Sequence, residues 1–403
     1  SARVNAPYQR GWCSWYQYFS SITEDALRSN LRRLKDLRRE FPINLVQLDD
    51  GYQAALGDWE YTNDKFPGGL KIIADEIRSA GFRAGLWTAP FLATRDSHLM
   101  RAHPGWFMRN QNGEPLAIIQ NPSWTLDEDK SAYALDPTHP EFEQYLERLF
   151  DRLVHEFGFT YLKLDFLFAA AAHGRRHQPD ITRAQTLRLG LETIRCGADE
   201  QSFLLGCGCP LGPAVGVVDG MRIGPDVAPY WGGNVEPGTR LAIEAIIARS
   251  FMHRRLWLND PDCLMLRSRE TRLSREERFA LAAAIAVSGG MMIISDNMDL
   301  LDSECNKLFQ RMGEIGMEAD TASHAEPPVA VSLMDDTAVH LLVTRKHDGV
   351  YGLFLNTADS PRSVSVSAIA SIGQPARLLG PDGESAAPEQ IELPAHSARI
   401  ISC

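Results

Sequence analysis

Two aspartates in apolar segments of this sequence each follow a cation at a short spacing. Lys163 precedes Asp165 by two positions, and Arg222 precedes Asp226 by four. Side chains two apart on a strand share a face, so Lys163 and Asp165 are predicted to point the same way. A nearby cation favours the ionised carboxylate that a nucleophile needs. Because both aspartates have such a neighbour, the spacing leaves open which is nucleophile and which is acid/base. Two structural ion pairs are the alternative interpretation.

Further aromatic, acidic and small residues stand where other apolar runs end. They are Trp12, Trp15, Asp49, Asp50, Trp87, Cys207, Gly208, Asp260, Asp262 and Asp296. Sugars stack their C–H faces on aromatic rings and pair their hydroxyls with carboxylates, lysine and arginine. Two carboxylates on either side of a glycosidic bond provide acid/base and nucleophilic catalysis. The set therefore indicates sugar chemistry, although Asp260 and Asp296 taken singly fit ordinary turn or capping roles equally well.

Three other chemistries fit these residues less well. None of the eleven histidines lies at the end of a predicted strand, which disfavours a metal-dependent hydrolase. Surrounding aspartates would keep Lys163 protonated and unreactive as a Schiff-base lysine, and the same negative field disfavours phosphate. We therefore expect neither metal nor cofactor. A catalytically inactive sugar-binding protein would be favoured by loss of Asp165 or Asp226, and both are present.

Eight apolar runs predict the strands that position these residues. They are Gly11–Trp15, Asn44–Asp50, Arg83–Pro90, Tyr161–Phe166, Phe203–Cys207, Gly220–Pro225, Arg255–Asn259 and Met291–Ser295. Strand and helix alternating eight times is typical of a closed (β/α)8 TIM barrel, whose active face lies at the carboxyl ends of the strands. An open doubly wound sheet would carry a glycine-rich phosphate loop after its first strand, and GWCSWYQYF contains none.

Amphipathic segments between the strands predict the helices. They are 24–41, 141–158, 182–195, 239–253, 275–288 and 305–312. The connection Leu92–Pro140 is long and rich in proline, tryptophan and asparagine. Long connections in compact domains usually form lids or substrate walls, and a local insertion that only pads the barrel is the alternative.

The spacing of apolar and polar residues changes near Ala325. Runs such as AVHLLVTR and GVYGLFLN alternate apolar and polar residues at period two, with turn residues between them. This pattern predicts a small antiparallel β-sandwich. We therefore expect two domains, a catalytic barrel over residues 1–320 and a C-terminal β-sandwich over residues 325–403.

Composition narrows the class of protein further. The formal net charge of −11 disfavours nucleic-acid binding, and no apolar run is long enough for a membrane span. The odd number of cysteines, seven, and a start without a signal-peptide pattern predict reduced thiols and a cytoplasmic location.

Five short motifs resemble glycoside hydrolase clan D, families 36 and 27, in the clan order. They are GWCSW, LDDGY, YLKLDF, MRIGPD and NDPD. Members of these families are mostly α-galactosidases and α-N-acetylgalactosaminidases, and the resemblance covers the barrel and extends to the C-terminal sandwich. It implies a retaining, exo-acting α-galactosidase that hydrolyses terminal α-linked galactose. An α-N-acetylgalactosaminidase, another α-glycosidase or a galactosyltransferase of the same clan stays open as the alternative.

The resemblance also implies a role for each residue that matches a motif. Asp165 matches the nucleophile and Asp226 the general acid/base. The substrate-binding matches are Asp49 and Asp50 for the 4- and 6-hydroxyls, Lys163 and Arg222 for other hydroxyls, Asp262 near the leaving side, Trp15 and Trp87 as walls, and Cys207 beside the 2-position. Gly208 departs from the larger residue of many family 27 enzymes. Family 36 members usually carry an N-terminal β-domain. Either such a domain has been removed from this sequence, or the pocket is completed by the chain's own loops or by another subunit of a homo-oligomer.

Overall fold

Each of the eight apolar runs contains or overlaps a strand in the computed structural model, which describes residues 1–39, 42–125, 127–233, 237–331, 338–367 and 376–403. The strands are β1 (Arg10–Cys13), β2 (Leu45–Leu48), β3 (Arg83–Thr88), β7 (Tyr161–Leu164), β8 (Phe203–Gly206), β9 (Gly220–Arg222), β10 (Leu258–Asp260) and β12 (Met292–Ile294). All eight strands are shorter than predicted, and seven of them, all but β10, end before the last residue of the predicted run. The chain forms two compact units.

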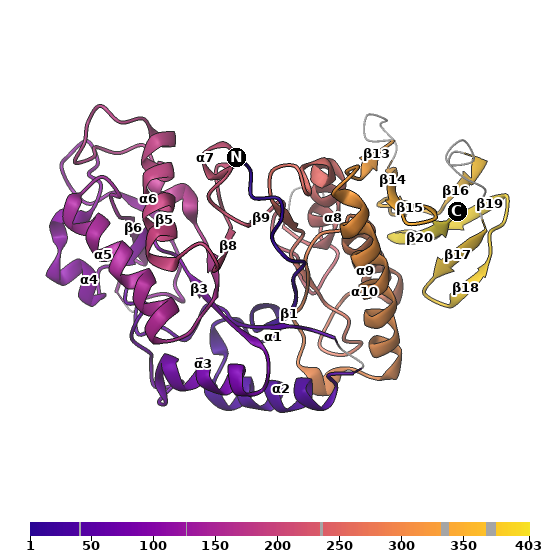
Figure 1. The fold of residues 1–403 in the computed structure, drawn as a ribbon, viewed down its shortest axis with the longest axis horizontal. Helices are drawn as coiled ribbons and strands as arrows, with labels where there is room; N and C mark the ends of the chain where they lie inside the picture. The colour runs from indigo at the N-terminus through magenta and orange to yellow at the C-terminus, as the bar shows by residue number, and fades with distance from the viewer. Residues whose placement is uncertain (40–41, 126, 234–236, 332–337, 368–375) are drawn as a thin grey trace. The chain divides into compact units, whose positions relative to one another are not determined.

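The first unit contains Ser1–Arg3, Tyr18–Lys35 and Asn44–Arg222. Its core is a parallel sheet in the order β2-β3-β7-β8-β9, coloured from indigo to magenta in Figure 1. The central strands β2, β7 and β8 are buried at every position, as expected for parallel strands covered on both faces.

Four helices of this unit are α2 (Glu24–Asp36), α3 (Gly69–Ser79), α5 (Pro140–Asp151) and α6 (Arg183–Ala198). Thr182 begins α6 with a capping box, since its side chain accepts from the Gln185 backbone while the Gln185 side chain accepts from the Thr182 backbone. Helix α5 continues as a π-helical turn, Arg152–Glu156, before Gly158 reverses the chain with a φ of +92°. Helix α3 is absent from the sequence prediction.

The long connection after β3 forms its own small layer. It contains the short helix α4 (His98–Ala102) and the strands β4 (Leu92–Thr94), β5 (Ala117–Gln120) and β6 (Ser131–Ala134). These strands form an antiparallel sheet in the order β4-β6-β5. Met108, Ala134 and Ala172 form a separate hydrophobic cluster beneath it. The connection is therefore a folded substructure with its own core.

The second unit contains Val4–Gln17, Asp36–Ile43 and Ile223–Cys403. Here β1 pairs in parallel with β12, which also pairs with β11 (Cys263–Leu264). The helices are α8 (Thr239–Arg249), α9 (Arg275–Val287) and α10 (Ser303–Ser323). Helix α10 is longer than its predicted core of 305–312, because its buried positions continue at helical spacing through Ile315 and Ala319.

The C-terminal strands of this unit form a six-stranded antiparallel sheet and a two-stranded one. The larger sheet has the order β13-β14-β15-β20-β17-β18, and the smaller pairs β16 with β19. The strands are β13 (Val329–Ala330), β14 (Val339–Lys346), β15 (Gly349–Asn356), β16 (Arg362–Ser365), β17 (Arg377–Gly380), β18 (Gly383–Ala386), β19 (Gln390–Leu393) and β20 (Ser397–Ser402). One hydrophobic cluster joins both sheets, with Phe354 and Ile401 from the larger and Ile391 and Leu393 from the smaller. Two further runs with the same alternating pattern, VAVSLM at 329–334 and RSVSVSAI at 362–369, were also predicted to be strands. Parts of both runs lie outside the described residues.

This β region packs against the helices α9 and α10, as Figure 1 shows in orange and yellow. The hydroxyl of Thr344 donates to the carbonyl of Val287 at 2.6 Å. Arg399 pairs with Glu276 at 2.7 Å. The imidazole of His396 lies 2.8 Å from a carboxylate oxygen of Glu277. The sheet therefore covers helix surface within its own unit.

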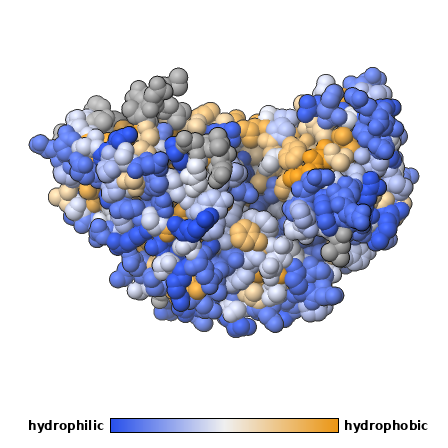
Figure 2. Space-filling view, turned by 180° about the vertical axis from the view of Figure 1, so that it is seen from behind, coloured by the Kyte–Doolittle hydropathy of each residue, from blue (hydrophilic) through white to orange (hydrophobic). Residues whose placement is uncertain are grey.

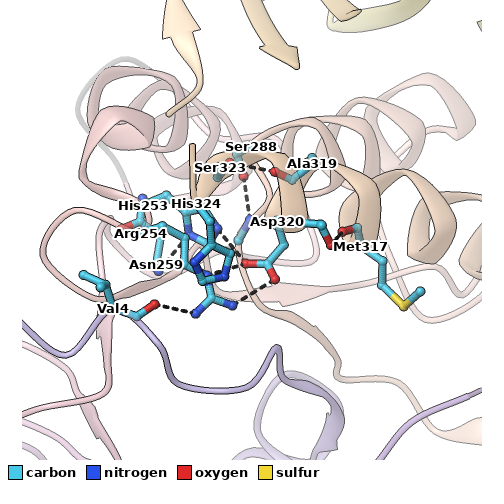
Figure 3. Close-up of polar contacts among 12 residues, drawn as sticks. Val4, His253, Arg254, Asn259, Ser288, Met317, Ala319, Asp320, Ser323 and His324 are labelled. Carbon is cyan, nitrogen blue, oxygen red and sulfur yellow. Dashed lines mark hydrogen bonds and ion pairs between the residues drawn. The ribbon is translucent and has the colours of Figure 1, made fainter. Parts of the chain in front are cut away.

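A buried polar network connects β10 with helix α10 (Figure 3). Two guanidinium nitrogens of Arg254 donate to the two carboxylate oxygens of Asp320, at 2.7 and 2.8 Å. The His253 ring nitrogen Nε2 lies 2.9 Å from Asp320, while Nδ1 accepts the backbone N–H of Asn259 at 3.2 Å. Arg254 also donates to the carbonyl of Val4 at 2.8 Å. The network thus joins α10, the turn before β10 and the segment before β1.

Hydrophilic residues cover most of the face seen in Figure 2. Within the described residues, no helix combines the length and the apolar character that a membrane crossing requires. No disulfide joins any of the seven cysteines, all of which lie in the described part of the chain.

Candidate active site

The strand ends of the first unit bring several of the predicted site residues to one edge of its sheet. Asp49 and Asp50 directly follow β2, and Asp165 directly follows β7. Trp87, near the end of β3, lies opposite Lys163 of β7 in the parallel register. Because parallel strands end at the same edge, these acidic, cationic and aromatic side chains form one cluster.

Asp165 is held by one donor on each carboxylate oxygen. The indole N–H of Trp87 donates to Oδ2 at 3.0 Å, and the backbone N–H of Phe166 donates to Oδ1 at 2.7 Å. Phe166 has a φ of +51°, so the chain turns sharply as soon as β7 ends. The carboxylate is half-buried. The two donors fix the direction of the carboxylate.

Trp87 lies deeper than a surface wall would. Its ring is buried and packs edge-on against Trp59, with ring centroids 5.6 Å apart. The carbonyl of Trp87 accepts the hydroxyl of Tyr52 at 3.0 Å. In the first unit Trp87 therefore orients Asp165 through its indole N–H, in addition to any contact with a ligand.

Lys163 and Asp49 form a buried ion pair beside this carboxylate. The ammonium of Lys163 lies 3.0 Å from Oδ2 of Asp49, and the Gln47 side chain donates to the same oxygen at 2.6 Å. Burial alone would lower the pKa of Lys163, but the charges of Asp49 and Asp165 raise it well above its usual value. Lys163 is therefore a fixed cation, as the sequence led us to expect, and unsuited to Schiff-base chemistry.

Asp50 is buried and meets only neutral donors. The Gln53 side chain donates to Oδ1 at 2.6 Å, and the indole N–H of Trp124 donates to Oδ2 at 2.8 Å. Burial raises the pKa of Asp50, and the negative charges of Asp49 and Asp165 raise it further. A carboxylate oxygen can accept more than one hydrogen bond, so Asp50 can still accept a ligand hydroxyl.

Sequence reasoning missed Gln47, Gln53 and Trp124. Trp124 comes from the long connection after β3, and its ring packs edge-on against Phe166 with ring centroids 5.1 Å apart. It thus links the connection to the turn that carries Asp165. This contact supports the interpretation of the connection as a wall of the site, whose only sequence signal was its length and its tryptophans.

The end of β8 lies directly beside the Asp165 turn. The backbone N–H of Phe168 donates to the carbonyl of Gly208 at 2.8 Å. Gly208 has a φ of +53°, and a Cβ there would lie 3.2 Å from the Phe166 nitrogen and 3.4 Å from Oδ1 of Asp165. Cys207 is buried just before it. Arg222 ends β9, also buried, and its charge acts on Lys163.

The other predicted site residues belong to the second unit. Trp15 begins the short helix α1 (Trp15–Tyr18) and is half-buried. Asp226 is exposed and lies in an irregular segment after β9. Asp262 is only 1% exposed and has a φ of +78°. Its carboxylate accepts the Tyr16 hydroxyl, the backbone N–H of Val227 at 2.9 Å and that of Cys263 at 2.8 Å.

Asp260 and Asp296 make local structural contacts. Asp260 accepts the backbone N–H of Asp262 at 2.9 Å. Asp296 pairs with Arg267 at 2.5 Å and accepts the N–H of Leu266 at 2.6 Å. These contacts account for both residues as turn or capping groups. Among the described residues, no group of three or more His, Cys, Asp or Glu could hold a metal ion.

The chain is similar to known proteins of one kind. The profile of the Melibiase family matches residues 16–194. An α-galactosidase of Escherichia coli is 30% identical over 157 residues, which are 37% of this chain and 20% of that protein. A solved α-galactosidase of Thermus thermophilus, in complex with p-nitrophenyl α-D-galactopyranoside, is 35% identical, with a TM-score of 0.67 over 78% of this chain and 63% of that one. The chain thus spans less than two thirds of the length of these relatives.

A more distant likeness extends over almost the whole chain. A family 27 β-L-arabinopyranosidase of Geobacillus stearothermophilus is 15% identical, with a TM-score of 0.70 over 99% of this chain and 96% of that one. At this identity the likeness concerns the fold alone. Together with the strand order within each unit and the two C-terminal sheets, it confirms the predicted fold class, a (β/α)8 barrel followed by a small antiparallel β-domain.

Proposed function

We propose that the chain, which is similar to the α-galactosidases of glycoside hydrolase clan D, is a retaining, exo-acting α-galactosidase. Its substrates would be small glycosides or oligosaccharides with a terminal α-linked galactose. The Thermus thermophilus relative has also been solved in complex with stachyose, which supports an oligosaccharide substrate.

The observation that carries the proposal is the setting of Asp165. Its carboxylate is half-buried, each oxygen has one directed donor, and the Lys163 cation acts within the same cluster. A nucleophilic carboxylate must be accessible and held in one direction, and this setting supports both. The carboxylates of Asp49 and Asp50 beside it can accept sugar hydroxyls.

In the first step, a carboxylate oxygen of Asp165 forms a bond to the anomeric carbon of galactose. The bond from that carbon to the glycosidic oxygen breaks, and Asp226 transfers its proton to that oxygen. The products are a covalent glycosyl-enzyme of inverted configuration and the free leaving group. The exposure of Asp226 in its own unit supports this role, since the group must exchange protons with water.

In the second step, Asp226 accepts a proton from a water molecule as the water oxygen bonds to the anomeric carbon. The bond to Asp165 breaks, which regenerates its carboxylate and releases galactose with its original α configuration. Both aspartates then return to their starting protonation states.

The first experiment measures hydrolysis of p-nitrophenyl α-galactoside and follows the product anomer by NMR. We expect α-galactose to form first. We expect Asp165→Ala to lose at least about 10⁴-fold in kcat, the order seen when a nucleophile is removed. Added azide should then yield β-galactosyl azide from Asp165→Ala and α-galactosyl azide from Asp226→Ala, because azide replaces a different partner in each case. Initial release of β-galactose, or substantial activity left in Asp165→Ala, would refute the mechanism.

The position of Gly208 beside Asp165 makes one rival substrate worth a parallel assay. A glycine presents no side chain to a 2-substituent, so an α-N-acetylgalactosaminidase is the second candidate. The same aryl glycoside with a 2-acetamido group separates the two activities. Faster turnover of the acetamido substrate would replace α-galactosidase by this second candidate.

A further inference from the structure

The segment that carries Asp226 has no regular structure of its own. Asp226 lies between the end of β9 and the start of α8, and its side chain is exposed. Proton transfer requires the carboxyl group to keep its position to within a fraction of an ångström, because catalysis falls steeply with misplacement. Contacts from elsewhere in the second unit must therefore fix this segment.

Asp262 contacts the residue that directly follows Asp226. Its Oδ2 accepts the backbone N–H of Val227, the next residue in the chain, at 2.9 Å. The same oxygen accepts the hydroxyl of Tyr16, and Oδ1 accepts the N–H of Cys263 at 2.8 Å. Three donors therefore fix the direction of the buried Asp262 carboxylate.

The backbone of Asp262 is held in an uncommon conformation. Its φ of +78° lies in the left-handed region, which a residue other than glycine adopts only when its surroundings require it. The N–H of Asp262 donates to Oδ1 of Asp260 at 2.9 Å. The strained turn directs the carboxylate to Val227 and Tyr16.

Tyr16 is itself firmly fixed. Its side chain is buried, its backbone N–H donates to the hydroxyl of Ser295 at 2.8 Å, and its carbonyl accepts from Arg267 at 3.1 Å. These partners follow β12 and β11, which pair with each other in this unit. Tyr16 thus connects Asp262 to the parallel sheet.

Contacts further along the segment fix its later residues. The Thr239 hydroxyl donates to the carbonyl of Ala228 at 2.8 Å, and the Arg272 N–H donates to that of Pro229 at 2.8 Å. The ring of Trp231 stacks on His396, with centroids 4.7 Å apart. The bond from Val227 to Asp262 acts on the residue that directly follows Asp226.

We propose that Asp262 and Tyr16 are positioning residues for the acid/base Asp226, acting through the backbone amide of Val227. Asp262 accepts that amide and Tyr16 holds the Asp262 carboxylate in place. The inference rests on the proposed function, because it concerns how one of its two catalytic groups is presented. It assigns Asp262 a role that differs from direct contact with the sugar.

The test compares leaving groups that do and do not need a proton. In Tyr16→Phe, kcat/KM for raffinose should fall about 10- to 100-fold, the effect of losing one hydrogen bond to a charged group. For 2,4-dinitrophenyl α-galactoside, whose leaving group departs without protonation, kcat/KM should change less than about twofold. Asp262→Asn should show the same selectivity with a larger loss on raffinose.

A double-mutant cycle provides the second readout. In an Asp226→Ala background the acid/base is already absent, so adding Tyr16→Phe should produce no further loss in kcat/KM on either substrate. Azide should accelerate turnover of the dinitrophenyl substrate by Tyr16→Phe and give α-galactosyl azide, the product expected when only acid/base function is impaired.

Tyr351→Phe is the matched control. Its hydroxyl also donates to a carboxylate of this unit, that of Glu318 on α10, at 2.5 Å. It should leave kcat/KM for both substrates unchanged. Equal losses on both substrates in Tyr16→Phe, or no loss on raffinose, would overturn the inference while the wild type remained an α-galactosidase. A wild-type protein that hydrolyses no α-galactoside would overturn the proposed function and the inference together.

Discussion

Asp50 and Asp320 are both buried aspartates, 3% and 6% exposed, yet their surroundings differ in kind. Both carboxylate oxygens of Asp320 accept hydrogen bonds from the Arg254 guanidinium, and one of them also lies 2.9 Å from the His253 ring. Asp50 meets only the neutral side-chain donors of Gln53 and Trp124. The first carboxylate is hydrogen-bonded to a cation of the protein, whereas the donors described for the second are neutral.

The pKa values of the two groups move in opposite directions. Burial alone would raise the pKa of Asp320, but hydrogen bonds from His253 and Arg254 outweigh it and lower the pKa below its usual range. Burial raises the pKa of Asp50, and nearby carboxylates raise it further. A buried acid with its cation stabilises the fold, while a buried acid beside other acids is retained at a cost in stability, as expected where a ligand supplies the missing partners.

The largest expected effect comes from removing the matched charge. Asp320→Asn leaves Arg254 buried without its anion, so the free energy of unfolding should fall by about 3–5 kcal/mol. Urea denaturation followed by circular dichroism measures it. The folded variant should keep its kcat/KM, since Asp320 belongs to the structural network of Figure 3. A loss of activity with unchanged stability would contradict the structural role of Asp320.

The converse change at the other site should separate activity from stability. Asp50→Asn removes a charged acceptor for sugar hydroxyls, so kcat/KM for p-nitrophenyl α-galactoside should fall about 10²- to 10³-fold. The melting temperature at pH 7 should be equal to or above that of the wild type, because one of several like charges is gone. A clear drop in melting temperature would show that Asp50 is structural in the same sense as Asp320.

A smaller effect is expected at the indole donor to Asp50. Trp124→Phe keeps an aromatic ring against Phe166 and removes only the N–H donor. The loss of one hydrogen bond to a charged group should lower kcat/KM about tenfold. Trp59→Phe is a control of equal chemistry, since its ring packs on Trp87 in the same unit. Equal effects of both variants would argue against a specific contribution from the Trp124 N–H.

The pH dependence of stability should carry opposite signs at the two aspartates. The lowered pKa of Asp320 contributes stability that is present above the unfolded value of about 3.9 and is lost as pH falls through the folded pKa. The raised pKa of Asp50 contributes stability that is present below about 3.9 and is lost as pH rises through the folded pKa. The deficit of Asp320→Asn should therefore shrink in acid, and any gain of Asp50→Asn should disappear there. Melting curves of the wild type and both variants, recorded from about pH 3 to about pH 7, test the direction of each pH dependence.

The sequence predicted the strand ends well because each carries its own local signal. An apolar run followed by a polar residue located Asp49, Asp50 and Asp165, and the spacing in KLD placed Lys163 on the same face. The roles of Asp165 and Asp226 came from the family resemblance, and they stay predictions until the variants are measured.

The residues that sequence reasoning missed depend on contacts between distant segments. Trp124 is 74 positions from Asp50, and no local pattern identifies its partner. Asp262 was predicted to lie near the leaving side of the sugar, but its left-handed turn and its contact with the Tyr16 hydroxyl leave no local signal in NDPD. Strand β18 went unpredicted because all four of its residues are exposed, which leaves no apolar alternation to detect.

The close packing at Gly208 limits how this enzyme can be redesigned. Any larger residue there would have to adopt a left-handed backbone and press on the turn that presents Asp165. A larger residue introduced there to narrow the space at the sugar's 2-position would press on Asp165 unless the turn after β7 moved with it.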